Sequence, residues 1–432
     1  MNRVIRISKT VLLVLLVGAS IVLSYFLWSD NLHEGSDIGF VSPAPTPTAT
    51  TPSIESAVRP YMVTVGTLQG LTVLGPGSNG YQYWTNALTS AHTYDPVTLK
   101  ALPPKTEMKV TYEFGIQLTH QLAGKWVANL GTALSAWEGR TIVLYAVPGD
   151  KVCRVGLVGS NNVMTVKTDL NLSTLINRAS LDIKSEPYDT WGVQDQVSYV
   201  PRNLMMMRQT VQIRQPDALP LVHSFFVNPQ AVTRIQQDKN TFLWTDGSRA
   251  VQWNQGKEEL RYEDPNGSQL NLHNDPFITA LDFIHTHGGG PQNVIGFDQL
   301  STLTIDPDVP AYVFTQFVDG YPVLSTGSDY DVDLQNGRVM EYNRPMWVLQ
   351  QPITQTPVSV LDKAQLLRQL KKVDSNPNPT DLHVILGYAM EPVDTHTDQA
   401  TLEPVYYVTN DSGSSWVVNA SDGTLMSGSD AS

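Results

Sequence analysis

The chain has 432 residues, of which 41% are hydrophobic and 16% are charged, and its formal net charge is −13. This length predicts two or three domains, because a single core rarely grows beyond about 250–300 residues. The composition is typical of a folded chain and excludes disorder along its whole length. The single cysteine, Cys153, excludes an intramolecular disulfide and any metal site built from several cysteines.

The first element is an apolar run, Thr10 to Trp28, which has nineteen residues and contains neither a charge nor a proline. As a helix rising about 1.5 Å per residue, it nearly matches a hydrocarbon core about 30 Å thick. Arg3, Arg6 and Lys9 precede it, and acidic residues follow it. Because basic flanks stay in the cytoplasm, we expect residues 1–9 inside the cell and the bulk of the chain outside.

A cleaved signal peptide is the alternative interpretation of this run. The run is longer than the usual signal-peptide core of about 7–15 residues, and no A-x-A-like cleavage site closes it. We therefore expect a retained helix that crosses the cell membrane once.

Small residues in the run indicate a contact with another helix. Ser20 and Ser24 are four residues apart and share one helix face, and Gly18 narrows the helix nearby. Small side chains let membrane helices approach closely, although such residues are also simply frequent in these helices. Gly18, Ser20 and Ser24 are our candidate partner-binding residues, and both interpretations stay open.

A linker is expected at residues 29–57, because the stretch from Ser42 to Ser53 is rich in proline and threonine and cannot bury a core. Beyond the anchor, 25 Lys+Arg stand against all 41 Asp+Glu. Such a charge disfavours nucleic acid and anionic lipid head groups as partners. We expect no nucleic-acid partner and contact with the bilayer through the one helix alone.

Gly75, Gly77 and Gly80 form a G-x-G-x-x-G motif between a predicted strand at residues 71–74 and a predicted helix. A dinucleotide site requires a returning parallel strand that ends at an acidic residue. Asp95 lies at a suitable distance, but no apolar strand leads to it. The motif therefore predicts a glycine turn and no cofactor site.

The segment 285–290, His-Thr-His-Gly-Gly-Gly, resembles the oxyanion loop of lipases and offers His285 and His287 as metal ligands. A lipase also needs a G-x-S-x-G elbow, which the sequence lacks, and zinc needs three or four ligands. Glycines after a helical pattern predict a helix end instead. We find no catalytic, metal or cofactor-binding residue and expect no enzyme activity.

The rest of the chain shows apolar runs that alternate with turn signals. Asp-Gly and Asn-Gly pairs predict hairpins at residues 246–247, 319–320, 336–337 and 422–423. Between 329 and 334 the apolar residues Tyr330, Val332 and Leu334 alternate with Asp329, Asp331 and Asp333, which predicts an antiparallel strand with one wet face.

Two helices and two buried segments complete the prediction. Helical spacing indicates helices near 276–286 and 361–372. Met205 to Met207 are expected in a strand that packs in the core, and Cys153 is expected to be a small buried residue. Together these elements indicate an α+β fold.

Two segments share their order of turns and a closing tyrosine, one from Thr241 to Gly267 and one from Phe317 to Pro345. This likeness predicts two related modules. We expect three outer domains, at residues 58–195, 196–297 and 298–432.

The order of segments resembles the YycH family, accessory regulators of the YycG (WalK) sensor histidine kinase. The resemblance is carried by "SKTVLLVLLVGASIVLSYFLW", "VHSFFVNPQAVTRIQ", "LWTDGSRAVQW", "LRYEDPNG", "ALDFIHTHGG", "FVDGYPVLS", "GRVMEYNRPMWVL", "HVILGYAMEP" and "LEPVYYVTNDSGSSWVV". It is collinear over nearly the whole chain, and residues 58–195 match least.

The resemblance implies a membrane-anchored regulator without enzyme activity. Its three outer domains would include a second and a third that are similar to each other. Its partners would be a YycG-like kinase and a YycI-like protein, contacted through the helix at residues 10–28, and its output would be cell-wall metabolism. Pairing of the chain with itself is left open.

Two alternatives from other classes remain. One is an anchored, wall-associated hydrolase whose site is too dispersed to see in sequence. The other is an outer ligand-binding or structural module without a signalling role. A cleft with convergent carboxylates or histidines would favour the enzyme.

Overall fold

The computed structural model describes residues 53–128, 137–192, 197–269, 275–291, 293–297, 311–325, 327–373, 381–392, 398–410 and 413–429. All of them belong to one compact unit, Thr46–Ser432. The expected membrane helix at residues 10–28 and most of the linker lie outside the described residues. No helix within these ranges has the length and apolar character needed to cross a membrane.

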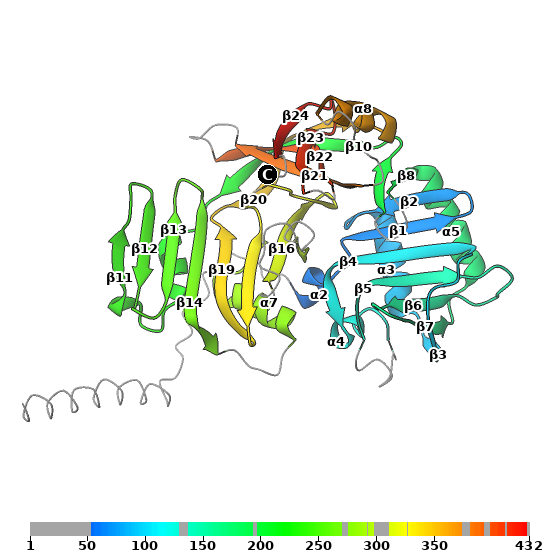
Figure 1. Ribbon diagram of the computed structural model, residues 1–432, viewed down its shortest axis with the longest axis horizontal. Coiled ribbons are helices and arrows are strands. Elements are labelled where there is room, and N and C mark those ends of the chain that lie inside the picture. The colour runs from blue at the N-terminus through cyan, green and yellow to red at the C-terminus, as the bar shows by residue number, and fades with distance from the viewer. Residues whose placement is uncertain are drawn as a thin grey trace, which may run out of the picture. The chain divides into compact units, whose positions relative to one another are not determined.

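The first sheet holds the strands from the N-terminal part of the described chain, and neighbouring strands run antiparallel. Helices α3 (Asn79–Ser90) and α5 (Leu172–Ser185) lie on one of its faces (Figure 1), and α2 (Ile54–Ala57) and α4 (His120–Ala123) are short. The strand order is β3 (Thr93–Leu99), β7 (Val163–Thr168), β6 (Arg154–Val158), β5 (Glu138–Ala146), β4 (Met108–Thr119), β1 (Met62–Thr67), β2 (Gly70–Leu74), β8 (Tyr188–Trp191) and β9 (Ser198–Pro201).

Helix α3 forms where the glycine motif predicted a turn and a helix. The side-chain oxygen of Ser78 accepts a hydrogen bond from the Tyr81 N–H at 3.2 Å, which satisfies one free donor of the first turn. Tyr81, Trp84 and Leu88 lie on one face of the helix and are buried. Burial of this face holds α3 against the sheet.

The second sheet has helices α6 (Ala218–Ser224) and α7 (Pro276–Thr286) beside it, and a short 3₁₀ turn lies at Pro229–Ala231. The strand order is β11 (Thr233–Gln236), β12 (Thr241–Thr245), β13 (Ala250–Asn254), β14 (Glu259–Gln269), β19 (Arg338–Pro345), β18 (Tyr330–Gln335), β16 (Ala311–Val318) and β15 (Val294–Gly296), and β17 (Tyr321–Pro322) pairs with β16.

Helix α7 confirms the predicted helix and its glycine stop. Asp275 caps the first turn and Pro276 occupies the first helical position. At the other end Gly288 and Gly289 have φ of 87° and 63°, and the Gly289 N–H donates to the Ile284 carbonyl at 2.8 Å. Glycine adopts this left-handed geometry at little cost, so the helix ends here.

The third sheet combines one strand from the middle of the sequence with strands from its end. Its order is β20 (Val348–Ser359), β10 (Met205–Arg214), β22 (Gln399–Asn410), β23 (Ser415–Asn419) and β24 (Leu425–Ser429), and β21 (Leu382–Pro392) pairs with β22. Helix α8 (Lys363–Val373), the second predicted helix, lies beside this sheet (Figure 1). Its Leu366 and Leu370 are buried in the core of the sheet.

The two later sheets cross the expected boundary between residues 297 and 298. The second sheet contains strands from both sides of it, and β10 joins the third sheet. The division into three outer domains stays a prediction. The second and third sheets each contain strands from both the expected middle and the expected C-terminal domain.

The predicted hairpins are confirmed. The turns at residues 246–247, 319–320, 336–337 and 422–423 join β12 to β13, β16 to β17, β18 to β19 and β23 to β24. Asn336 and Gly337 have φ of 55° and 75°, which suits a primed two-residue turn.

Two expectations about single residues need correction, and a third is confirmed. Met206 is buried as predicted, but Met205 and Met207 are 56% and 39% exposed, because neighbouring residues of β10 point to opposite faces. Asp95 does lie in a strand: β3 is an edge strand with exposed residues on both faces, so no apolar pattern announces it. Cys153 is buried as expected, directly before β6.

Candidate functional sites

The glycine motif contributes a close packing contact. A Cβ atom on Gly75 would lie 2.5 Å from the Gly320 carbonyl oxygen, so only glycine fits there. The strand after α3 is β3, which pairs antiparallel with β7. A dinucleotide fold needs a parallel return at this point. The prediction of a turn without a cofactor site agrees with this topology.

The histidine-glycine segment places His287 against a serine. His287 Nδ1 lies 3.1 Å from the Ser224 hydroxyl oxygen, and Ser224 also donates to the Leu221 carbonyl at 2.7 Å. The half-buried imidazole stacks on Phe225 at 4.3 Å between ring centroids. Loss of solvent, reinforced by Arg249, lowers the pKa of His287 to about 3, so the imidazole is neutral at pH 7.

A Ser–His contact alone does not make a nucleophile. A general base works best with a pKa near the working pH, and His287 titrates far below it. Its ring also packs between the side chains of Phe225 and Phe283, with centroids 4.3 Å from each. We assign this pair to the packing between α6 and α7.

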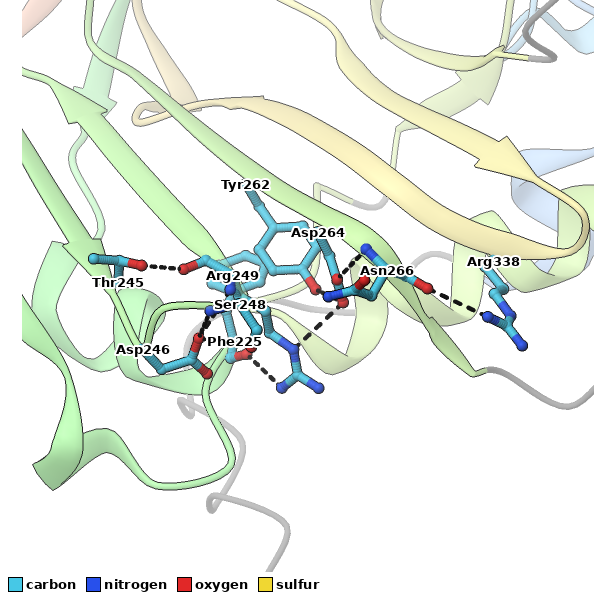
Figure 2. Close-up of polar contacts among 9 residues, drawn as sticks. All are labelled: Phe225, Thr245, Asp246, Ser248, Arg249, Tyr262, Asp264, Asn266 and Arg338. Carbon is cyan, nitrogen blue, oxygen red and sulfur yellow. Dashed lines mark hydrogen bonds and ion pairs between the residues drawn. The ribbon is translucent and has the colours of Figure 1, made fainter. Parts of the chain in front are cut away.

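Figure 2 shows a polar network around Asp264, which is 2% exposed. Its carboxylate accepts from the Tyr262 hydroxyl at 3.2 Å and from the Asn266 N–H at 3.0 Å, and Arg249 Nε lies 3.4 Å away. Arg249 also donates to the Phe225 carbonyl at 3.5 Å. The network connects β14, the start of β13 and the end of α6.

The turn before β13 is fixed by its own side chains. Asp246 accepts from the N–H groups of Ser248 and Arg249 at 2.9 and 2.8 Å, and the Thr245 hydroxyl donates to the Arg249 carbonyl at 2.7 Å (Figure 2). These bonds orient Arg249 towards Asp264. These contacts hold the turn before β13 against β14 and the end of α6, so we assign the network to stabilisation of the fold.

The acidic face of β18 is less exposed to solvent than predicted. Tyr330, Val332 and Leu334 are buried, as expected, whereas the three aspartates are half-buried. Burial and the nearby Asp331 raise the pKa of Asp329 to about 8. Burial and the negative charges of Asp333, Glu259 and Glu341 raise the pKa of Asp331 to about 7. Burial and Glu341 raise the pKa of Asp333 to about 6. Within the described ranges, no group of three or more His, Cys, Asp or Glu side chains is arranged to hold a metal ion.

A cleft of about 780 Å³ is a candidate binding site among the described residues. Glu113 and Arg140 line it, together with aromatic side chains that include Tyr61, Tyr199 and Tyr321. The Thr141 hydroxyl donates to Glu113 at 3.0 Å, and Arg140 donates to the Gly115 carbonyl at 3.3 Å. Burial raises the pKa of Glu113.

The lining of this cleft bears on the hydrolase alternative. Glycoside hydrolysis uses two carboxyl groups on either side of the scissile bond. Glu113 is the one carboxyl residue among those that line the cleft within the described chain. The aromatic and mixed polar lining therefore suits binding of a ligand better than this hydrolytic chemistry.

The candidate contact residues Gly18, Ser20 and Ser24 lie outside the described residues, so the contact stays a prediction. Sequence reasoning missed Arg344, whose guanidinium is buried beside the glycine segment. Its neighbours in sequence, "EYNRPMW", show an arginine at the end of a strand and give no sign of this burial.

The three sheets and their helices define an α+β protein built mainly from antiparallel strands. The crystal structure of YycH from Bacillus subtilis has this fold: its TM-score is 0.63 at 14% identity, over 84% of this chain and 96% of that one. An uncharacterised protein from Eubacterium rectale reaches a TM-score of 0.36 at 12% identity, over 56% and 93% of the two chains, which is too low to support an argument. No curated protein matches.

The family model described as "YycH protein, C-terminal domain" matches residues 194–418, more than half of the chain. The chain therefore belongs to the YycH family, as the order of its segments predicted.

Proposed function

We propose that this protein is a membrane-anchored regulator of a YycG (WalK)-type sensor histidine kinase, and that it thereby controls cell-wall metabolism. Membership of the YycH family, a family of regulatory accessory proteins, is the observation that carries this proposal. The same membership favours a role without catalysis. The cleft lining, which has one carboxyl residue among the described side chains, is consistent with that role.

The proposed contact is the apolar run at residues 10–28, which would cross the cell membrane with its N-terminus in the cytoplasm. Gly18, Ser20 and Ser24 would let the kinase helix, or that of a YycI-like partner, approach closely. A helix that packs differently on two signalling states shifts their populations by its difference in affinity. The outer sheets would then hold the partners together or report an external condition.

Co-purification from membranes tests this assembly. We expect the full-length protein to capture the kinase and the YycI-like protein, and we expect capture to be lost when residues 10–28 are replaced by an unrelated spanning helix. Capture of neither partner by the native chain would refute the proposal. Full capture by the replaced chain would move the contact to the outer domains.

A double substitution locates the contact face. Ser20→Ile with Ser24→Ile should weaken capture about tenfold, because bulky side chains separate the helices. Phe26→Ile is the control, since Phe26 lies about 120° or more round the helix from both serines and about 80° from Gly18. Equal capture by the two variants would remove Ser20 and Ser24 from the interface.

A further inference from the structure

Arg344, near the end of β19, is a buried cation whose contacts are all neutral. It is 2% exposed. Its Nη1 donates to the carbonyls of His287 and Gly289 at 3.2 and 3.1 Å, its Nε donates to the Pro345 carbonyl at 3.4 Å, and the Tyr330 ring lies 5.2 Å away. No carboxylate pairs with it in the described part of the chain. Burial of a charge without a counter-charge is unfavourable.

The glycine segment creates this arrangement. A Cβ atom on Gly288 would lie 2.9 Å from Arg344 Nη1 and 2.5 Å from a Leu221 methyl carbon. Gly288 and Gly289 have no side chains and adopt left-handed backbone angles. The carbonyl oxygens of His287 and Gly289 can therefore reach the Arg344 guanidinium. The segment thus orients Arg344 as well as ending α7.

Arg344 lines a cleft of about 700 Å³ where the second and third sheets meet. A second guanidinium, that of Arg214, lines the same cleft, as do the side-chain amides of Gln209 and Gln355. Asp319 is the one carboxyl residue among the described lining residues, and it accepts a hydrogen bond from Gln209 at 2.5 Å. The lining therefore carries two cations against one anion, in a chain of net charge −13.

We propose that this cleft binds a small anion through Arg344 and Arg214. Arg344 Nη2 donates to none of the described residues, and a planar guanidinium suits the paired oxygens of a carboxylate or phosphate group. The Gln355 amide donates to Gln209 Oε1 at 3.3 Å and the Gln209 amide donates to Asp319, so these side chains hold one another in place beside the two guanidinium groups. This site goes beyond the proposed function and does not depend on it.

Isothermal titration of the full-length protein in detergent tests the site. The probes are inorganic phosphate, N-acetylglycine and its uncharged amide, N-acetylglycinamide. We expect saturable binding of at least one of the two anions and none of the amide. Binding of phosphate alone would identify a phosphoryl ligand, and binding of N-acetylglycine alone would identify a carboxylate ligand.

Arg344→Lys should weaken anion binding about tenfold, because the paired hydrogen bonds of the guanidinium are lost while the charge remains. Arg214→Gln should also weaken it. Arg202→Gln is the control, because Arg202 is exposed and pairs with Asp189 at 2.8 Å, away from this cleft.

Circular dichroism establishes whether each variant folds. If Arg344→Lys does not fold, Arg214→Gln decides, since the Arg214 side chain is only half-buried. The proposal is overturned if neither anion binds the native protein, if the amide binds as tightly as N-acetylglycine, or if the folded variants bind like the native protein.

Discussion

Asp182 on helix α5, beside the first sheet, and Arg344 on β19 of the second sheet are both buried charges, but their surroundings differ. Asp182 accepts from the Trp84 indole at 2.9 Å and forms an ion pair with Arg178 at 2.9 Å. Arg344 contacts only carbonyls and an aromatic ring, and it borders a cleft. A charge with its counter-charge inside the core stabilises a fold, whereas a charge without one is available to a ligand.

Removal of the Asp182 charge should have the largest effect. Asp182→Asn leaves Arg178 without its anion, so we expect a loss of about 3 kcal/mol in the free energy of unfolding, measured with urea. Asp95→Asn is the control, because the Lys167–Asp95 pair is exposed and should contribute less than about 1 kcal/mol. Equal losses of unfolding free energy in the two variants would show that the buried Asp182 charge contributes no more to stability than an exposed ion pair.

The acidic face of β18 should make stability fall as pH rises. Asp331 has a folded-state pKa of about 7, above its unfolded value of about 3.8. Its contribution is therefore fully present below pH 4 and is lost as pH rises through 7. Asp331→Asn should be more stable than the native protein at pH 8 by about 2 kcal/mol, a figure reduced for solvent screening. The prediction is contradicted if the two proteins differ by the same free energy of unfolding at pH 4 and at pH 8.

His287 should act in the opposite direction, and its effect should be smaller. Its folded-state pKa of about 3 lies below its unfolded value of about 6.5. Its contribution is therefore present above pH 6.5 and is lost as pH falls towards 3. His287→Phe should keep the ring stacking and reduce the loss between pH 7 and pH 5 by about 1 kcal/mol, as thermal or urea unfolding can measure. If the native protein and His287→Phe lose the same free energy of unfolding between pH 7 and pH 5, His287 is solvated in the folded state.

Local patterns predicted much of the fold. The Asn336-Gly337 pair determined one hairpin because few residues adopt its left-handed geometry, and the glycines after His287 marked a helix end. Pairing between distant strands was not predictable: β10 pairs with β20 and β22, which follow it by more than a hundred residues. Such pairing depends on tertiary packing and has no local signal.

The sites were harder to predict than the fold. Arginine is mostly exposed in proteins, so the burial of Arg344 becomes visible only when the carbonyls of His287 and Gly289 are placed around it. The glycines after His287 correctly predicted a helix end, whereas the contact between His287 and Ser224 joins residues far apart in sequence and had no local signal. The proposed contact through Gly18, Ser20 and Ser24 stays a prediction.

Autophosphorylation of the YycG-type kinase of the same organism, reconstituted in nanodiscs, tests the regulatory role most directly. The rate is measured with the kinase alone, with this full-length protein and its YycI-like partner added, and with the chain whose residues 10–28 are replaced. We expect the native chain to change the rate several-fold and the replaced chain to leave it at the basal value. An identical rate in all three samples would contradict the proposal that this protein regulates the kinase.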